Sequence, residues 1–429
     1  MTELKSMSNT RLQEYYAALS SKYQDFQAQN LKLDMSRGKP CTDQLDLSAN
    51  LLDCLSKSDY KASDGTDCRN YGGMDGIPEA KELFAWILEV KPQEIIIGGN
   101  SSLSMMHDLL SRAMLHGLPE SQLPWSRLPR VKFLCPSPGY DRHFAICQHL
   151  GIEMITIPYL EDGPDMDQIE KLAAEDPAIK GIWCVPKYSN PTGITYSDAV
   201  VKRLAAMPVK APDFRIFWDN AYAVHHLTNT PDQLLDILKA CCTAGHPDRV
   251  FEFSSTSKIS FPGSGIAMLA SSIKNINWLK EQLKIQTIGP DKLNQLRHAR
   301  FFKDEAGIKA HMVRHAAIIK PKFDLVLEIL ASELGDTKLA SWSNPQGGYF
   351  ISLDTLPGCA KKTVEKAAAA GVLLTPAGAT YPYGKDPEDK NIRLSPTFPP
   401  LSELKLAMEL VVLCVKLVSV EQELSHRGL

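Results

Sequence analysis

The stretch FRIFWDNAY, residues 214–222, joins a mostly apolar run to a polar turn. Residues 214–218 are rich in aromatic and β-branched side chains and lack the alternation of a half-exposed strand. This pattern predicts a strand that is buried on both faces, as in a parallel sheet. The next four residues, Asp219 to Tyr222, place polar side chains directly beyond the end of that strand.

Similar short apolar runs occur before and after this stretch in the sequence. Further short apolar runs predict strands at residues 94–97, 131–134, 153–157, 181–185, 250–253 and 266–270. Helical segments lie between them: Leu103, Met106, Leu110 and Met114 fall on one helix face before Gly117 ends the turn. The alternation predicts an α/β domain with a mainly parallel seven-stranded sheet.

The pattern changes after about residue 284. A long helical stretch covers residues 312–334, and short strands are expected at 349–353, 372–374 and 391–394. Further helices are expected at 361–370 and 402–418. This part predicts a second, smaller α+β domain.

Composition narrows the class of protein. The 429 residues carry a formal net charge of −3, which gives no global attraction to nucleic acid or to anionic membranes. No apolar stretch approaches the length of a membrane span, and the polar first sixteen residues lack the apolar core of a signal peptide. None of the ten cysteines forms a C-x-x-C pair, so we expect reduced thiols, no metal site and a cytoplasmic location.

Five polar clusters each follow a predicted strand. They are residues 98–102 (GGNSS), 136–140 (PSPGY), 189–193 (SNPTG), 219–222 (DNAY) and 254–258 (SSTSK). Ligands of open α/β sheets bind beyond the carboxyl ends of the strands, so the clusters are expected to converge on one crevice. The first cluster leads into a helix whose free N–H groups suit a phosphate.

Lys258 is the candidate nucleophile. A lysine that is desolvated near a buried strand has a lowered pKa, and its neutral amine can form a Schiff base with an aldehyde. The alternative is a surface lysine in a serine-rich loop. Asp219 and Tyr222 favour the first interpretation, because a carboxylate can keep a pyridine nitrogen protonated and a tyrosine hydroxyl can stabilise a ring oxygen.

At these residues the chain resembles the class I and II aminotransferases of pyridoxal-phosphate (PLP) fold type I. The resemblance spans about residues 36–394 and rests on five motifs: Asn190-Pro191-Thr192-Gly193, Asp219-x-x-Tyr222, Ser255-x-x-Lys258 with Pro262-Gly263, Pro345-x-Gly347-Gly348-Tyr349-Phe350, and Arg393-Leu394-Ser395. The segment Ser36-Arg37-Gly38-Lys39-Pro40 looks most similar to a bacterial subgroup of aspartate aminotransferases labelled "MocR-like".

The resemblance implies the cofactor pyridoxal 5'-phosphate and a role for each matched residue. Lys258 would form the Schiff base and shuttle the proton, Asp219 would pair with the pyridine nitrogen, and Tyr222 and Asn190 would bond the ring oxygen. Tyr140 would stack on the ring, and the phosphate would be held by Ser101, Ser102, Ser255 and Tyr71, the last from the neighbouring subunit of a homodimer. Arg393 would clamp the substrate α-carboxylate, with Gly38 and Asn190 lining the same end.

The resemblance also implies the reaction and the domains. An amino acid, with aspartate as the expected donor, would pass its amino group to a 2-oxo acid such as 2-oxoglutarate by a ping-pong mechanism. Residues 1–45 would pack with the small domain, 46–300 would form the PLP-binding domain, and 301–429 the small C-terminal domain.

One feature departs from the family pattern. Pro262-Gly263 is followed by Ser264-Gly265-Ile266, whereas most relatives carry a phosphate-binding arginine shortly after this pair. Serine hydroxyls and helix N–H groups are therefore expected to carry more of the phosphate binding. For a distal substrate carboxylate the sequence offers Arg37, Lys39, Arg297 and Arg300 and does not choose among them.

Two other functions stay open at this stage. A PLP-dependent lyase or decarboxylase on the same fold would carry the same lysine, because a fold does not fix the reaction. A transcription regulator with a degenerate aminotransferase domain would need an N-terminal DNA-binding domain, and only about thirty residues precede Ser36.

Overall fold

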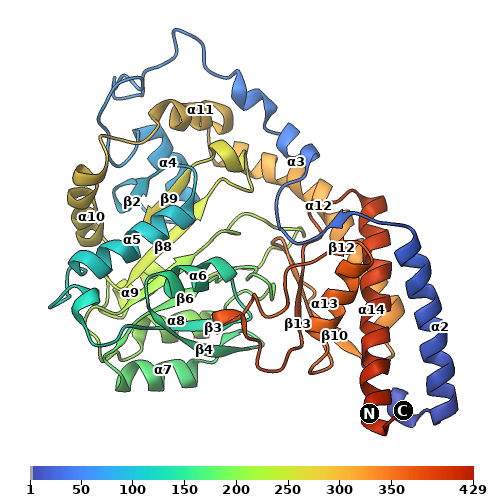
Figure 1. The fold of residues 1–429 in the computed structure, drawn as a ribbon. Helices are drawn as coiled ribbons and strands as arrows, with labels where there is room; N and C mark the ends of the chain where they lie inside the picture. Colours follow the sequence, from blue (N-terminus) through green and yellow to red (C-terminus); the bar gives the residue numbers. More distant parts are fainter. Residues whose placement is uncertain (1–2) are drawn as a thin grey trace.

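The computed structural model describes residues 3–429 and consists of a large α/β part and a smaller part rich in helices (Figure 1). An eight-stranded sheet forms the centre of the large part. In spatial order its strands are β2 (Ile95–Ile97), β9 (Ala267–Ala270), β8 (Val250–Ser255), β7 (Arg215–Asp219), β6 (Ile179–Cys184), β3 (Lys132–Ser137), β4 (Glu153–Leu160) and β5 (Gly163–Pro164).

The sheet is mainly parallel, as the sequence predicts. β8, β7, β6, β3 and β4 pair in parallel, whereas β9 runs antiparallel to both of its neighbours, β2 and β8. All seven predicted strands are present. The eighth, the two-residue β5, adds an antiparallel edge to β4. The carboxyl ends of the five parallel strands therefore lie at one edge of the sheet.

Helices cover both faces of this sheet (Figure 1). One face packs against α5 (Ser102–His116), α6 (Asp141–His149) and α10 (Ile273–Gln286), and the other against α7 (Met166–Glu175), α8 (Asp198–Ala206) and α9 (Ile237–Thr243). α4 (Pro78–Ile87) and α11 (Lys292–Phe302) pack at the β2–β9 edge. Ser101 caps α5 by accepting a hydrogen bond from Ser104 N, and Gly117, at φ 78°, ends the helix.

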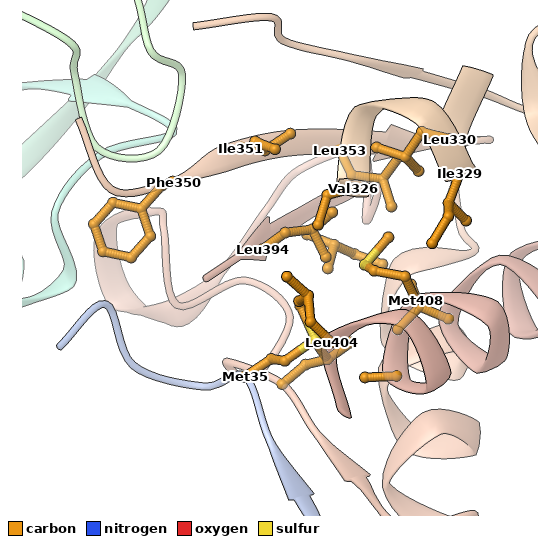
Figure 2. Close-up of a cluster of buried hydrophobic side chains, with 14 of the residues drawn as sticks. Met35, Val326, Ile329, Leu330, Phe350, Ile351, Leu353, Leu394, Leu404 and Met408 are labelled. Atoms are coloured by element: carbon orange, nitrogen blue, oxygen red, sulfur yellow. The ribbon is translucent and has the colours of Figure 1, made fainter. Parts of the chain in front are cut away.

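The smaller part contains two small sheets and long helices. β10 (Ala340–Trp342), β11 (Ile351–Thr355) and β13 (Asn391–Leu394) form an antiparallel sheet, and β1 (Leu33–Asp34) pairs with β12 (Val372–Leu373). They pack on α12 (Glu305–Leu334), α13 (Ala360–Ala369) and α14 (Leu401–Arg427). Figure 2 shows the shared core, in which side chains of α12, β11, β13 and α14 meet Met35 of the N-terminal segment.

Element boundaries differ from the sequence-based ones in this part. The helix expected at 312–334 begins at Glu305, the last helix continues to Arg427, and the strand expected at 349–353 runs from Ile351 to Thr355. Tyr349 and Phe350 lie before that strand because Gly348, at φ 84°, turns the chain immediately ahead of them.

The N-terminal helix α2 (Asn9–Ala28) lies along α14, and the two chain ends are close together (Figure 1). Leu12 and Leu19 are buried against Leu417 and Val420. The remaining short helices are α1 (Glu3–Ser6), α3 (Thr42–Asp46) and the 3₁₀ turns η1 (Ala49–Leu52), η2 (Pro92–Glu94), η3 (Trp125–Arg127), η4 (Pro262–Ser264) and η5 (Pro382–Gly384). Across residues 3–429, no helix has the length and hydropathy needed to cross a bilayer.

Candidate active site

A cavity of about 620 Å³ lies where the two parts of the molecule meet. Its walls come from the carboxyl ends of the parallel strands, the N-terminus of α5, residues 36–39, residues 373–376 and Arg393. All five polar clusters predicted to converge contribute to this region, through Ser101 and Ser102, Tyr140, Asn190, Asp219 and Tyr222, and Ser255, Ser257 and Lys258.

Lys258 follows β8 by three residues and points its amine into this cavity. Its Nζ lies 5.1 Å from the centre of the Tyr222 ring and 5.7 Å from that of Tyr349. Burial lowers the pKa of Lys258, and the nearby Asp219 carboxylate opposes that shift. Burial therefore favours the neutral amine, the form that can act as a nucleophile or a base.

The loop that carries Lys258 is firmly held. Thr256 N donates to Ile266 O at 2.7 Å, and Ile266 N donates back to Thr256 Oγ1 at 2.8 Å. The hydroxyl of Ser260 donates to the same Thr256 oxygen at 2.9 Å. These bonds fix the backbone on both sides of Lys258.

Asp219 is the last residue of β7, and only one of its oxygens is engaged by protein. Oδ2 lies 3.0 Å from His143 Nε2, whereas Oδ1 is buried without a hydrogen-bond partner in the described structure. The His143 ring is stacked on Trp183, with ring centres 4.2 Å apart and planes 7° apart. A buried carboxylate oxygen is thus left free at the cavity wall, oriented by an imidazole held in place by stacking.

Tyr222, Asn190 and Tyr140 line the same cavity as Lys258 and Asp219. Burial raises the pKa of Tyr222 well above its ordinary value and that of Tyr140 to about 12. Both phenols therefore stay protonated and can donate hydrogen bonds. The Tyr140 ring packs edge-on against His143 at 4.9 Å.

Arg393, on β13, is a buried guanidinium at the far end of the cavity. Nη1 donates to Asp141 Oδ1 at 2.8 Å and to Asn190 Oδ1 at 3.4 Å, and Nη2 donates to Thr375 Oγ1 at 3.3 Å. The Phe350 ring lies 5.0 Å from the guanidinium carbon. Gly38 covers that ring closely, since a Cβ at this position would lie 2.4 Å from Phe350 Cζ.

The candidate phosphate-binding end consists of the α5 N-terminus with Ser101, Ser102, Ser255 and Ser257. Ser255 Oγ donates to Ser257 Oγ at 3.0 Å. The described residues that form this end include no arginine, and Ile266, which follows shortly after Gly263, is 1% exposed and packed in the apolar core. Hydroxyls and helix N–H groups are the donors offered at this end.

The four basic residues considered for binding a distal substrate carboxylate differ in whether they line the cavity. Arg37 and Lys39 line the cavity, whereas Arg297 and Arg300 do not; Arg300 is paired with Asp59 and Glu79. Tyr71 is 78% exposed and lies outside the cavity wall of its own chain.

Sequence reasoning missed several residues of the site. His143 lies three residues after Tyr140, in the first turn of α6, and only that placement after a strand-end cluster could have indicated it. Arg142 and Thr375 also line the cavity. Thr375 carries no local signal, because its part in the site depends on the packing of the smaller part of the molecule.

The family model described as "Aspartate amino-transferase" matches residues 7–427. This chain belongs to that aminotransferase family. A protein from Mycolicibacterium smegmatis, named as an aminotransferase, is 52% identical to this chain over 407 residues. The match covers 94% of this chain and 95% of that protein.

Two comparisons involve Corynebacterium glutamicum. A protein named aspartate aminotransferase is 47% identical over 418 residues, covering 97% of this chain and 96% of that protein. The crystal structure of an aspartate transaminase from the same organism superimposes with a TM-score of 0.96 at 46% identity and covers 99% of both chains. The aminotransferase is therefore of PLP fold type I, as the sequence motifs predicted.

The cofactor of this aminotransferase family is pyridoxal 5'-phosphate, and the cavity fits it. The unpartnered Asp219 oxygen suits a protonated pyridine nitrogen, and the buried Lys258 amine suits the cofactor's aldehyde. The serine-lined N-terminus of α5 suits the phosphate. Within residues 3–429 no group of three or more His, Cys, Asp or Glu side chains is arranged to hold a metal ion.

Proposed function

We propose that this aminotransferase takes the amino group from aspartate and passes it to 2-oxoglutarate in a ping-pong reaction. The observation that carries the proposal is a single cavity in which a buried lysine amine, a free buried carboxylate oxygen and a buried arginine face one another. The name of the Corynebacterium glutamicum relative supports aspartate as the donor.

Lys258 acts as the cofactor's covalent anchor and as the base. Its burial favours the neutral amine, so Nζ would accept the proton of the substrate α-carbon and deliver a proton to the cofactor carbon that carries the aldehyde. When bound, the pyridinium ring of PLP supplies the electron sink that stabilises negative charge at the substrate α-carbon. Asp219 keeps that ring nitrogen protonated through Oδ1, while His143 orients the carboxylate through Oδ2.

Protonated phenols and serines hold the remainder of the cofactor. Tyr222 and Asn190 would donate hydrogen bonds to its ring oxygen, and Tyr140 would pack against the ring. Ser101, Ser102 and Ser255 bind the phosphate together with the helix N–H groups of α5.

Arg393 binds the substrate α-carboxylate, and Gly38 and Asn190 line that end. Asp141 and Asn190 already fix the guanidinium, which prepares its remaining N–H groups for a carboxylate. Its Nε has no hydrogen-bond partner in the described structure. Arg37, Lys39 and Arg142 add positive charge to the walls of the cavity, which favours a donor with a second carboxylate.

Donor screening with 2-oxoglutarate as acceptor tests this function. We expect glutamate formation with aspartate, and a KM for aspartate that rises about tenfold or more in Arg142→Ala or Arg37→Ala while KM for alanine changes little. Arg300→Ala is the matched control, because its guanidinium is paired with Asp59 outside the cavity. Release of ammonia or pyruvate without glutamate formation would contradict the proposal and favour a lyase.

We further propose a homodimer in which Tyr71 reaches the phosphate of the neighbouring subunit. Tyr71, Ile285 and Ile288 are 78%, 88% and 61% exposed, and Gly72 N donates to Ile288 O, so these apolar side chains belong to one region. Clustered exposed apolar residues are typical of an interface. A two-fold arrangement is also the commonest for soluble homo-oligomers.

We propose the domain limits 1–45, 46–300 and 301–429. The packing of α2 on α14 supports assigning the N-terminal segment to the smaller domain.

A cytoplasmic location is proposed on the ground that all ten cysteines are free thiols. Membership of the bacterial subgroup labelled "MocR-like" remains a proposal that rests on the segment around Gly38.

A further inference from the structure

Asn220, between Asp219 and Tyr222, is held by three consecutive residues of the neighbouring strand β8. Its backbone N donates to Phe253 O at 2.8 Å, and its backbone O accepts from Ser254 Oγ at 3.0 Å. Its side-chain Nδ2 donates to Glu252 Oε1 at 3.0 Å. The turn that presents Asp219 and Tyr222 is therefore fastened to the strand that leads to Lys258.

Glu252 is an unusual residue for its place in the fold. It lies in the middle of a central strand, 3% exposed, and its side chain does not line the reaction cavity. A small cavity of about 40 Å³ adjoins it, and the charged groups that face this space are Glu89, Lys187 and Asp236. Burial raises the pKa of Glu252 to about 8.

The cost of burying this carboxyl needs an explanation, because an apolar side chain would pack a central strand at lower cost. The group forms no ion pair within 4 Å among the described residues and makes one hydrogen bond, the one to Asn220. The side chain of Glu252 therefore bonds the turn that carries Asp219 and Tyr222, and not the charged groups that face the small cavity.

We propose that Glu252 is a positioning residue for the amino transfer, which acts through Asn220 to fix Asp219 and Tyr222 relative to Lys258. β8 carries Glu252 and leads to Lys258, and β7 ends in Asp219, so this bond adds a side-chain link to the backbone pairing that joins the two strand ends. The inference rests on the roles given to Asp219, Tyr222 and Lys258 in the proposed function.

The test uses the PLP-loaded enzyme and four variants: Glu252→Gln, Glu252→Leu, Asn220→Ala and the double variant Glu252→Leu/Asn220→Ala. Glu252→Leu and Asn220→Ala each remove the bond, and we expect kcat to fall about tenfold or more with KM changed less than about threefold. Glu252→Gln keeps an acceptor oxygen of the same shape and is expected to restore kcat to within about twofold of the original. The double variant should be no slower than the slower single variant, because both substitutions remove one interaction.

A spectroscopic readout separates positioning from simple loss of stability. The pH midpoint of the bound cofactor's absorbance change should shift by about half a unit or more in Glu252→Leu and Asn220→Ala, and not in Glu252→Gln, because the midpoint depends on how Asp219 meets the ring nitrogen. Unchanged kcat and midpoint in soluble, cofactor-loaded Glu252→Leu would overturn the inference. Failure of the proposed function would differ, since the unmodified enzyme would then form no glutamate.

Discussion

At the scale of single residues, the cavity shifts the pKa values of the ionisable groups that it buries. Burial moves Lys258 toward the neutral amine and keeps Tyr222 and Tyr140 protonated. Asp219 is the complementary case, a carboxylate with one oxygen oriented by His143 and the other left for a ligand. The chemistry of the site therefore depends on burial as much as on residue type.

Glu252 gives a pH dependence with a definite sign. Its pKa in the folded protein is raised from 4.5 to about 8, so the folded state binds this proton more tightly than the unfolded chain. The free energy of unfolding should therefore fall as pH rises from about 4.5 to about 8 and level off above. Urea unfolding at pH 5 and at pH 8.5 measures this effect in the original protein and in Glu252→Gln. Between the two pH values, the free energy of unfolding of the original should fall by at least about 1 kcal/mol more than that of Glu252→Gln. This is a conservative figure, because a pKa difference of one unit between the folded and unfolded states corresponds to about 1.4 kcal/mol. An equal pH response in both proteins would contradict this account.

The sequence singled out Lys258, Asp219 and Arg393, which the structure brings together in one cavity, but it did not indicate the residues that support them. Lys258, Asp219 and Arg393 were predicted because their chemistry requires particular residue types in recognisable motifs. His143 was missed because a histidine in the first turn of a helix has no distinctive pattern, and its contact with Asp219 joins positions 76 residues apart. Arg297 and Arg300 do not line the cavity of their own chain, and charge alone does not reveal that Arg300 is already paired with Asp59.

At the scale of elements, the strands of the large sheet were predicted well because most of them are short apolar runs buried on both faces; β4 is the exception, with exposed residues along its length. The boundaries of α12 and α14 were not, since their terminal turns are fixed by contacts with distant segments. α12 illustrates this: His311 Nε2 lies 2.8 Å from Ile259 O, next to Lys258, and 3.0 Å from His315 Nε2. Gln44 Nε2 then joins His315 Nδ1 to the Tyr349 hydroxyl, so one helix connects the lysine loop with the N-terminal segment.

The helix pair α2–α14 carries a prediction about stability. Leu12 is fully buried between these helices, and Leu12→Ala should lower the free energy of unfolding by about 2–4 kcal/mol because it leaves a cavity. Chemical denaturation measures the change, and kcat at 25 °C should stay within about twofold because Leu12 is not part of the cavity wall. The neighbouring exposed Gln13→Ala is the control, with an expected change within about 0.5 kcal/mol. If Leu12→Ala lowered the free energy of unfolding no more than Gln13→Ala does, the packing of α2 would contribute little to the stability of the fold.

At the scale of the whole molecule, two parts enclose one cavity. The large part supplies the strand ends that present Lys258 and Asp219, and the smaller part supplies Arg393 and Thr375. This arrangement could be predicted as two domains from the change in sequence pattern. How they meet could not, because the contacts across the cavity join residues that no local pattern relates.

The proposed dimer makes a prediction at the same scale. Ile288→Asp places a charge in the exposed apolar region around Tyr71, and light scattering should show a shift from dimer toward monomer together with weaker PLP binding. Leu160→Asp is the control, because Leu160 is also exposed, at 54%, but lies on β4 near the opposite edge of the sheet. A monomeric unmodified enzyme with full activity would exclude a role for Tyr71 in the neighbouring subunit.

The most direct test of the account is to identify the amine that holds the cofactor. Borohydride reduction of the yellow, PLP-loaded enzyme followed by peptide mass spectrometry should find the phosphopyridoxyl group on Lys258, and the visible absorbance band should disappear on reduction. Lys258→Ala should lack that modification and lose amino transfer by at least about a thousandfold while keeping its fold. Modification of a different lysine, or amino transfer that survives in Lys258→Ala, would contradict the central claim.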